Sequence, residues 1–152
     1  NATGMFLGLR NTHTKADIVR SVIEGISLEA RHILESVLAA GVAMDDVITI
    51  TGGVSKSKTW CQVLADIMGR KIRTLVVPDA AVLGAAGLAA MGAGLVKNLD
   101  EFVSDMVQFG EVYEPIAENV AIYNKSFDAY KAAYYGLKEK DVFTKLAELR
   151  PK

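Results

Sequence analysis

The chain has 152 residues, of which 51% are hydrophobic and 23% are charged. This length and composition predict one globular domain with a sizeable core. The net charge of −1 gives no electrostatic reason to expect a nucleic acid or an anionic membrane as a partner. The single cysteine, Cys61, excludes a disulfide framework. The two histidines of the chain, His13 and His32, are too few to complete a zinc cluster with it.

A long helix is the first strong pattern along the chain. Residues 1–13 are expected to form a loop with room for a short strand, and the helix follows over residues 15–40. Thr14 offers an N-cap hydroxyl, and Asp17 stands three residues later in the capping-box position. Gly41 stands where a left-handed residue ends a helix. Apolar residues at spacings of four or seven predict one apolar face, which consists of Ile18, Val22, Ile26, Ile33 and Val37.

Strand and helix patterns alternate in the next part of the chain. The predicted elements are a strand over residues 47–51, a glycine turn over 52–56, a helix from Ser57 or Thr59 to Gly69, and a strand over 71–77 that ends at Pro78. The first strand reads VITIT, and such a short β-branched run is typical of a buried strand. The buried face of the helix is expected to carry Trp60, Val63, Leu64 and Ile67.

A run of 17 uncharged residues, 80–96, reaches only the lower limit of a membrane-spanning length. Most of these residues are Ala or Gly, which are weakly hydrophobic. A buried helix over residues 80–91 is therefore the better interpretation.

The last third of the sequence is predicted to be mostly helical. We expect a short helix over residues 99–107, a loop over 113–119, a helix that stops near Gly136, and a terminal helix over 139–149. Tyr123, Phe127, Tyr130 and Tyr134 form an aromatic stripe on the third of these segments, which we interpret as core packing because no basic groove accompanies it. The order of elements predicts an α/β fold with helices on at least one face of a small sheet.

The adjacent glycines Gly52 and Gly53 separate a predicted strand from a predicted helix. Such a turn can bind an anion, because free amides point outward at a helix N-terminus and no Cβ blocks close approach. GVSKSKT lacks the second glycine of a Walker phosphate loop, and GGVSKS lacks the GxGxxG spacing of a dinucleotide site, so both are excluded. Two interpretations remain, a nucleotide loop of the actin, hexokinase and sugar-kinase type and a plain βα turn.

Four stretches in order share the motifs of one known family. They are GMFLGLRNTHTKADIVRSVIE, TGGVSKSKTWCQVLADIMGRKI, AAVLGAAGLAAMGAG and YEPIAENVAIYNKSFDAY. The first is similar to the second signature of the FGGY family of carbohydrate kinases, and its signature positions hold Gly4, Phe6, Gly8, Leu9, Asp17, Ile18, Ser21, Val22, Ile23 and Glu24. The others resemble the adenosine-binding segment, the small-residue helix and the C-terminal helix entry of that family. The chain thus resembles the C-terminal domain of these kinases over residues 4 to about 135.

The resemblance implies an actin-like, ribonuclease-H-type ATPase fold of two lobes with ATP in the cleft. It implies that Gly52, Gly53 and Val54 lie along the ATP with amides near the phosphates, and that Ser55 and Ser57 lie near the base or ribose. It places the catalytic base, the second phosphate loop and most sugar contacts upstream, so no catalytic residue or metal ligand is expected in residues 1–152. It further implies Mg²⁺ as cofactor, a cytoplasmic kinase, a pentulose such as xylulose as substrate, and room for a homodimer.

Several charged residues are not assigned to chemistry. Asp17, Asp66 and Asp79 are expected at a helix cap, on a helix surface and in a loop, so we expect the chain alone to phosphorylate nothing. Lys56 and Lys58 could attract phosphate, but lysines on an exposed turn are usually solvated. The alternative function is a non-catalytic, actin-like interaction module whose glycine loop is only a turn.

Overall fold

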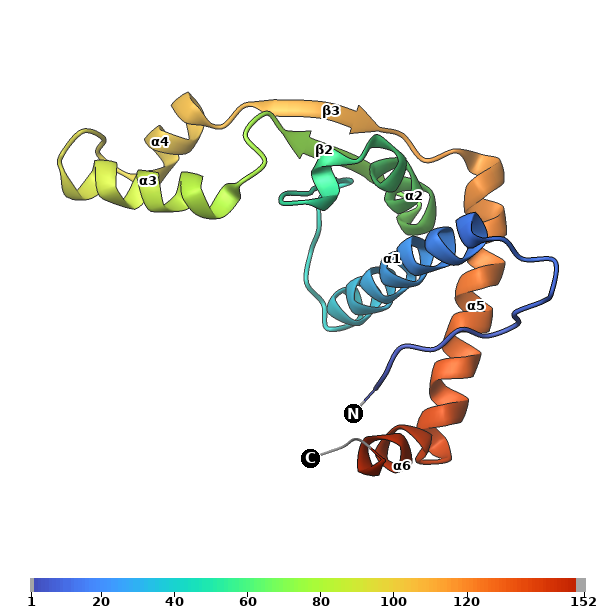
Figure 1. The fold of residues 1–152 in the computed structure, drawn as a ribbon. Coiled ribbons are helices and arrows are strands. Elements are labelled where there is room, and N and C mark those ends of the chain that lie inside the picture. Colours follow the sequence, from blue (N-terminus) through green and yellow to red (C-terminus); the bar gives the residue numbers. More distant parts are fainter. Residues whose placement is uncertain (1, 150–152) are drawn as a thin grey trace.

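A computed structural model describes residues 2–149 of the chain (Figure 1). Three strands form one small mixed sheet in the order β1-β2-β3, with β1 parallel to β2 and β2 antiparallel to β3. The strands are β1 Val47–Thr49, β2 Lys71–Leu75 and β3 Phe109–Tyr113. The helices are α1 Lys15–Ala39, η1 Val54–Lys56, α2 Lys58–Met68, α3 Ala80–Gly92, α4 Leu99–Met106, α5 Ala117–Glu139 and α6 Val142–Glu148, where η1 is a 3₁₀ turn.

The first helix begins as its capping residues predict. The Thr14 hydroxyl accepts a hydrogen bond from the Asp17 backbone amide at 3.4 Å, and the Asp17 carboxylate accepts one from the Thr14 amide at 2.7 Å. These bonds complete a capping box. The bonds that the Thr14 amide and the Thr14 hydroxyl donate to the Asp17 carboxylate lower the pKa of this carboxyl. Gly41 follows the helix with a φ of 83°, so the predicted left-handed stop is confirmed.

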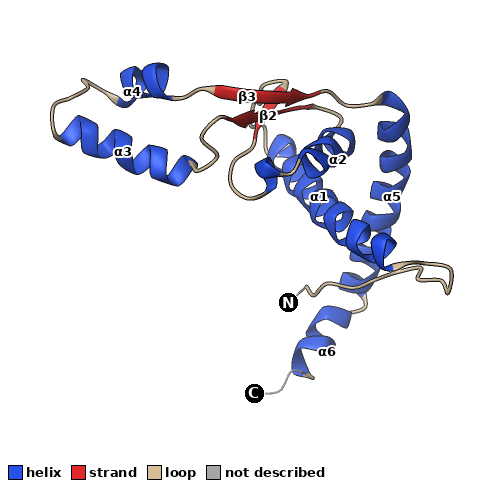
Figure 2. Cartoon of the chain, turned by 45° about the horizontal axis from the view of Figure 1, so that its top comes forward, coloured by secondary structure: helices blue, strands red, loops and turns tan. Residues whose placement is uncertain are grey.

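The core lies where α2 meets its neighbours. One cluster joins α2 to α1 and α5, and a second joins α2 to the sheet. Figure 2 shows the ribbon of α2 beside α1 and next to the sheet from a second direction. The first cluster consists of Leu28, Val63, Ile67, Tyr123 and Phe127, and the second of Leu64, Ala65 and Ile72. The first two aromatic residues of the predicted stripe are therefore core residues.

Helix α1 does not bury the apolar face that its periodicity predicted. Its buried residues are Ser27 and Leu28, because α2 and α5 contact that side. Four of the five residues in the predicted apolar face are exposed instead, namely Val22, Ile26, Ile33 and Val37. The periodicity predicted the helix correctly, but residues 2–149 leave this face largely uncovered.

The strands depart from their predicted bounds. Each of β1 and β2 ends two residues before its predicted end, and β3 was not predicted at all. The sequence of β3, FGEVY, contains a glycine and a glutamate, so it lacks the β-branched run that marked the other strands. Gly110 fits there because a Cβ would lie 2.6 Å from the Thr74 hydroxyl oxygen on the neighbouring strand.

The predicted end of the aromatic helix near Gly136 is wrong. Helix α5 continues through this glycine to Glu139. A Cβ at Gly136 would meet nothing within 4 Å, so no packing contact requires glycine there. A single glycine inside a helix costs only about 1 kcal/mol, which does not end a well-packed helix.

Helices α3 and α4 pack on each other and extend away from the sheet (Figure 1). Gly87 is buried between them, and a Cβ there would lie 2.9 Å from a ring carbon of Phe102. The prediction of a buried helix over residues 80–91 is wrong for the described chain, because Gly87, at the contact with α4, is the one buried residue of α3, and Gly84 faces open space. Within residues 2–149 we find no helix with the length and apolar character needed to cross a membrane.

Candidate functional site

The glycine pair follows β1 at the carboxyl end of the parallel strands, where ligands of open α/β sheets usually bind. Gly52 and Gly53 are both exposed, and a Cβ at either position would have nothing within 4 Å. Gly52 has a φ of 79°, which favours glycine. Gly53 has an ordinary helical conformation with φ −62° and ψ −36°. The two glycines thus have different roles, since only Gly52 needs its backbone freedom.

Two hydrogen bonds hold the glycine loop in place. The Gly52 amide donates to the Pro78 carbonyl oxygen at 2.7 Å, which joins the loop to the segment between β2 and α3. The Ser55 hydroxyl donates to the Gly52 carbonyl oxygen at 2.7 Å. Because the Gly52 amide is already bonded, it is not available to a ligand in this geometry.

The next three amides are free. Among residues 2–149, no acceptor takes a hydrogen bond from the amides of Gly53, Val54 or Ser55. They open the turn η1, whose amides at its start have no partner within the turn itself. Three successive unpaired amides beside an exposed glycine are donors of the kind that bind an anion.

The two serines predicted to contact a ligand have bonds inside the fold. The Ser57 hydroxyl caps α2 by accepting a hydrogen bond from the Trp60 amide at 3.3 Å, whereas the Ser55 hydroxyl bonds within the loop. The Trp60 indole in turn donates to the Ser27 hydroxyl of α1 at 3.2 Å. Val54 packs against the core cluster under the sheet. The structure therefore brings all five predicted residues together, with side chains that mainly shape the loop.

Of the two lysines near the loop, Lys58 has an anionic partner within the chain. Its Nζ lies 2.5 Å from Glu111 Oε1, and the Tyr113 hydroxyl donates to Glu111 Oε2 at 2.5 Å. The bond from Lys58 lowers the pKa of Glu111, and the bond to Glu111 raises the pKa of Tyr113 to about 12. Lys56 is exposed on the turn.

The sequence predicted Asp66 on a helix surface, but the structure buries it. Its side chain is only 2% exposed, and its carboxylate accepts hydrogen bonds from the Ile116 amide at 2.8 Å and from the Asn119 side-chain nitrogen at 2.8 Å. Gln62 donates a third bond at 2.9 Å. Asp66 therefore fixes the start of α5 against α2. Ile116 and Asn119 lie 50 and 53 positions away from Asp66, so these two partners were not visible from the sequence.

A buried thiol lies directly beneath the loop. Cys61 is fully buried, its Sγ is 3.6 Å from the Val54 carbonyl oxygen, and burial raises the pKa of the thiol. Such a thiol is unreactive, so it serves packing. Among residues 2–149, no three His, Cys, Asp or Glu side chains are arranged to hold a metal ion.

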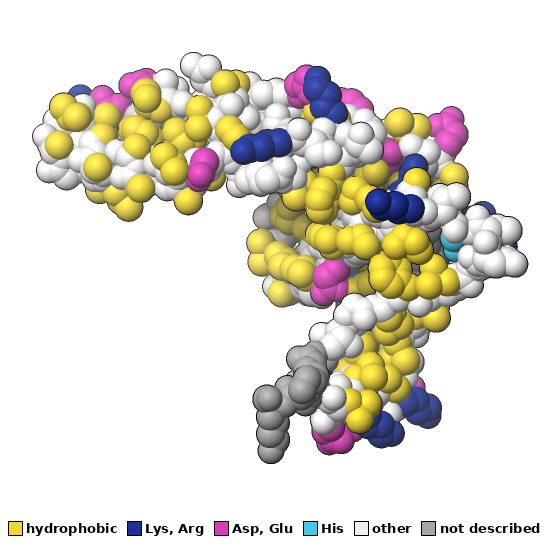
Figure 3. Space-filling view, viewed as in Figure 1, with side chains coloured by type: hydrophobic (Ala, Val, Ile, Leu, Met, Phe, Trp, Pro, Cys, Tyr) yellow, Lys and Arg dark blue, Asp and Glu magenta, His cyan; other side chains and the backbone are white. Residues whose placement is uncertain are grey.

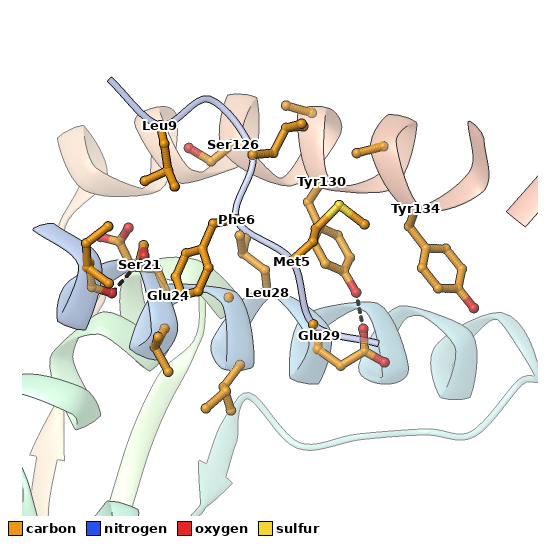
Figure 4. Close-up of a pocket in the computed structure, with 18 of the residues that line it drawn as sticks. Met5, Phe6, Leu9, Ser21, Glu24, Leu28, Glu29, Ser126, Tyr130 and Tyr134 are labelled. Carbon is orange, nitrogen blue, oxygen red and sulfur yellow. Dashed lines mark hydrogen bonds between the residues drawn. The ribbon is translucent and has the colours of Figure 1, made fainter. Parts of the chain in front are cut away.

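A cavity lies elsewhere in the described chain. It has a volume of about 1190 Å³ and lies between residues 2–9, α1 and α5, as Figure 4 shows in close-up. The glycine pair lies on an open surface of the described chain.

Comparison with known proteins gives a consistent result. A family model described as the FGGY family of carbohydrate kinases, C-terminal domain, matches residues 1–93. A xylulose kinase of Staphylococcus epidermidis is 37% identical over 136 residues, which are 90% of this chain and 27% of the relative.

Two solved structures are also similar. A ligand-bound xylulose kinase from Lactobacillus acidophilus has a TM-score of 0.80 and 31% identity, over 95% of this chain and 29% of that one. A Plasmodium falciparum glycerol kinase solved with ADP has a TM-score of 0.64 and 25% identity, over 88% of this chain and 26% of that one. The chain thus spans less than a third of the length of these relatives.

Proposed function

Because the chain belongs to the FGGY family of carbohydrate kinases, we propose that it is the C-terminal, nucleotide-binding part of an ATP-dependent sugar kinase. The family match and the similarity to the solved kinases confirm the predicted family and the predicted actin-like α/β fold. The proposal concerns what residues 1–152 contribute to a longer polypeptide. Residues 1 and 150–152 lie outside the described part of the chain.

The observation that supports this proposal most directly is the set of free amides at the glycine loop. Gly53, Val54 and Ser55 offer three unpaired N–H donors at the carboxyl end of β1. Donors of this kind bind phosphate oxygens well, because they are fixed before the ligand arrives. The exposed face of Gly53 lets a nucleotide approach the main chain closely.

In the proposed reaction a sugar hydroxyl oxygen attacks the γ-phosphorus of ATP, the bond to the β-phosphate oxygen breaks, and ADP leaves. A base takes the hydroxyl proton, and we assign this base to the polypeptide outside residues 1–152. Mg²⁺ would neutralise phosphate charge, and the described residues offer no cluster to hold it. The part played by this chain is to fix the nucleotide in position, which is a large share of catalysis in phosphoryl transfer.

We propose a pentulose such as xylulose as the substrate of the whole kinase and the cytoplasm as its location, where ATP and free sugars occur together. Of the three similar proteins named above, two are xylulose kinases and one is a glycerol kinase, which supports a small polyol or ketose as the substrate.

The test is ADP release by the longer polypeptide with ATP, Mg²⁺ and a panel of pentuloses, hexuloses and glycerol. We expect the fastest release with xylulose, and none above blank with residues 1–152 alone. Turnover by the isolated chain would contradict the proposal.

One observation favours a second function, a non-catalytic interaction module. The hydroxyls of Ser55 and Ser57 and the amide of Gly52 are all engaged within the fold, as they would be in a plain turn. Nucleotide binding distinguishes the two functions, because an interaction module leaves the amides of Gly53 to Ser55 unchanged when ADP is added.

A further inference from the structure

Arg73 lies at the point where β1 leaves the sheet for the glycine loop. It is the middle residue of β2 and pairs in register with Thr49, the last residue of β1. The Ile50 amide, just beyond β1, donates to the Arg73 carbonyl oxygen at 2.8 Å. Gly53 follows Thr49 closely in the sequence, so no more than about 14 Å of extended chain separates them. Arg73 is therefore at the same end of β1 as the free amides of the loop.

The side chain of Arg73 is held by groups from both neighbouring strands. Its Nε and Nη2 atoms donate to the Thr49 hydroxyl oxygen at 3.2 and 3.0 Å. The guanidinium carbon lies 3.4 Å from the centre of the Phe109 ring on β3, in a cation–π contact. A guanidinium that is fixed in this way loses little side-chain freedom when it binds an anion.

Arg73 points to the face of the sheet that α2 does not cover. Side chains alternate between the two faces of a strand. Ile72 is fully buried in the cluster between α2 and the sheet, and Ile48 of β1 packs against this cluster. The side chains of Arg73 and Thr49 therefore lie on the opposite face, where Arg73 is partly buried and Phe109 is 54% exposed. Figure 1 shows helices α1 and α2 on one side of the sheet.

No carboxylate of the described chain pairs with Arg73. Arg20, Arg31 and Arg70 each form an ion pair, whereas Arg73 has no Asp or Glu partner among residues 2–149. Its Nη1 atom makes no hydrogen bond within that range either. A partly buried cation whose contacts are a neutral hydroxyl and an aromatic ring is stabilised by an anion at its free N–H groups. The described chain thus leaves a fixed cation without a counterion.

The lysines near the glycine loop are less suited to hold a phosphate. Lys58 already forms an ion pair with Glu111. Lys56 is exposed, so a bond to it must offset the lost freedom of a long side chain. In the view of Figure 3, Lys and Arg side chains are scattered among apolar ones and form no continuous basic patch. Recognition of an anion on the face shown there depends on single, well-oriented cations.

We propose that Arg73 is a phosphate-binding residue of the nucleotide site, and that its free N–H groups donate to phosphate oxygens of ATP or ADP. This inference deepens the proposed function and rests on it. A guanidinium presents its N–H groups in a planar fork that matches two phosphate oxygens. Arg73 adds a fixed positive charge to the neutral amide donors of the loop, and phosphoryl transfer depends on such neutralisation of phosphate charge. Thr49 orients the fork.

The test compares ADP with adenosine, which lacks phosphates. Dissociation constants are measured by titration calorimetry on the longer kinase polypeptide, in the parent and in Arg73→Gln. We expect Arg73→Gln to weaken ADP binding by about 10- to 100-fold and to leave adenosine binding unchanged. Unchanged ADP affinity, or equal losses for the two ligands, would overturn the inference and leave the proposed function standing. A parent polypeptide that does not bind ADP would overturn the proposed function and this inference with it.

Further variants separate phosphate binding from a structural role. Arg73→Lys keeps the charge but not the planar fork, so it should recover only part of the lost ADP affinity. Thr49→Val removes the oxygen that orients the guanidinium and should weaken ADP binding by a smaller factor than Arg73→Gln. Lys125→Gln removes an exposed positive charge from α5 and is the matched control, with no effect expected.

Two results with these variants would contradict a direct contact with phosphate. A loss of ADP affinity in Lys125→Gln as large as that in Arg73→Gln would mean that only the net charge matters. A lower Tm of Arg73→Gln with unchanged ADP affinity would mean that Arg73 pairs with a carboxylate of the longer polypeptide.

Discussion

At the scale of single residues, polar contacts set the geometry of the glycine loop. The Ser55 hydroxyl donates to the Gly52 carbonyl oxygen, and the Pro78 carbonyl oxygen accepts from the Gly52 amide. The Ser57 hydroxyl caps the helix that follows. These short bonds leave Gly53 and the two amides after it free. The fold thus fixes the shape of the loop, which would lower the entropy lost on binding of the proposed nucleotide.

The two glycines should respond differently to the same substitution. Gly52→Ala places a side chain at a φ of 79° and should destabilise the chain by about 1–2 kcal/mol. Gly53→Ala, at a φ of −62°, should be neutral or stabilising by up to about 1 kcal/mol. Urea unfolding of both variants measures the difference. A larger loss at Gly53 than at Gly52 would show that the loop has another conformation.

Removal of the Asp66 carboxylate should weaken the junction of α2 and α5. Asp66→Ala leaves the Ile116 amide and the Asn119 side chain without their acceptor in a buried site, which should cost about 2–4 kcal/mol of unfolding free energy. Asp66→Asn keeps one acceptor oxygen and should cost less. Asp105→Ala, at an exposed position, is the matched control and should change stability by less than about 0.5 kcal/mol. Equal stability of all three variants would contradict the contact.

The Tyr113–Glu111 pair should make stability depend on alkaline pH. The folded-state pKa of Tyr113 is raised to about 12 from 10.0, because the neutral hydroxyl donates to the Glu111 carboxylate. A raised folded pKa stabilises the fold below the unfolded pKa, and this contribution is lost as pH rises from 10 to 12. The difference in unfolding free energy between the parent chain and Tyr113→Phe should be flat below pH 10 and then shrink. A difference that stays constant up to pH 12 would show that the bond is absent in solution.

At the scale of elements, the sequence predicted the helices whose ends or composition are marked by residues close together in the chain. The capping box of α1, the glycine end of α2 and the small-residue helix α3 all follow from residues close together in the chain. β3 could not be predicted, because its strand conformation depends on pairing with β2 and not on β-branched residues. The uncovered face of α1 was equally hidden, since periodicity shows that a face is apolar and not what covers it.

Two glycines within α3 allow a matched test of the contact between α3 and α4. Gly87→Ala places a Cβ 2.9 Å from the Phe102 ring, so the helices must separate, at a cost of about 1–3 kcal/mol. Gly84→Ala meets nothing within 4 Å and should stabilise the helix by up to about 1 kcal/mol. Opposite shifts of the unfolding midpoint are the expected result. A stabilising Gly87→Ala would mean that the two helices do not pack as described.

At the scale of the whole molecule, the position of the glycine loop in the fold was predictable, but its hydrogen bonds were not. The sequence placed residues 52–57 between a strand and a helix, and the structure confirms this order. Gly52 and Gly53 are exposed there. The engagement of the Gly52 amide by Pro78 depends on a partner 26 positions away in the sequence, so no local pattern revealed it. The exposure of Val22, Ile26, Ile33 and Val37 on α1 was likewise not visible from periodicity.

The most direct test of the central claim is a titration of the 15N-labelled chain with ADP. The account predicts that the amide resonances of Gly53, Val54 and Ser55 move, that the Gly52 amide, bonded to Pro78, moves less, and that Gly53→Val reduces the response. Shifts confined to other regions, or no shift at millimolar ADP, would contradict a nucleotide site at this loop.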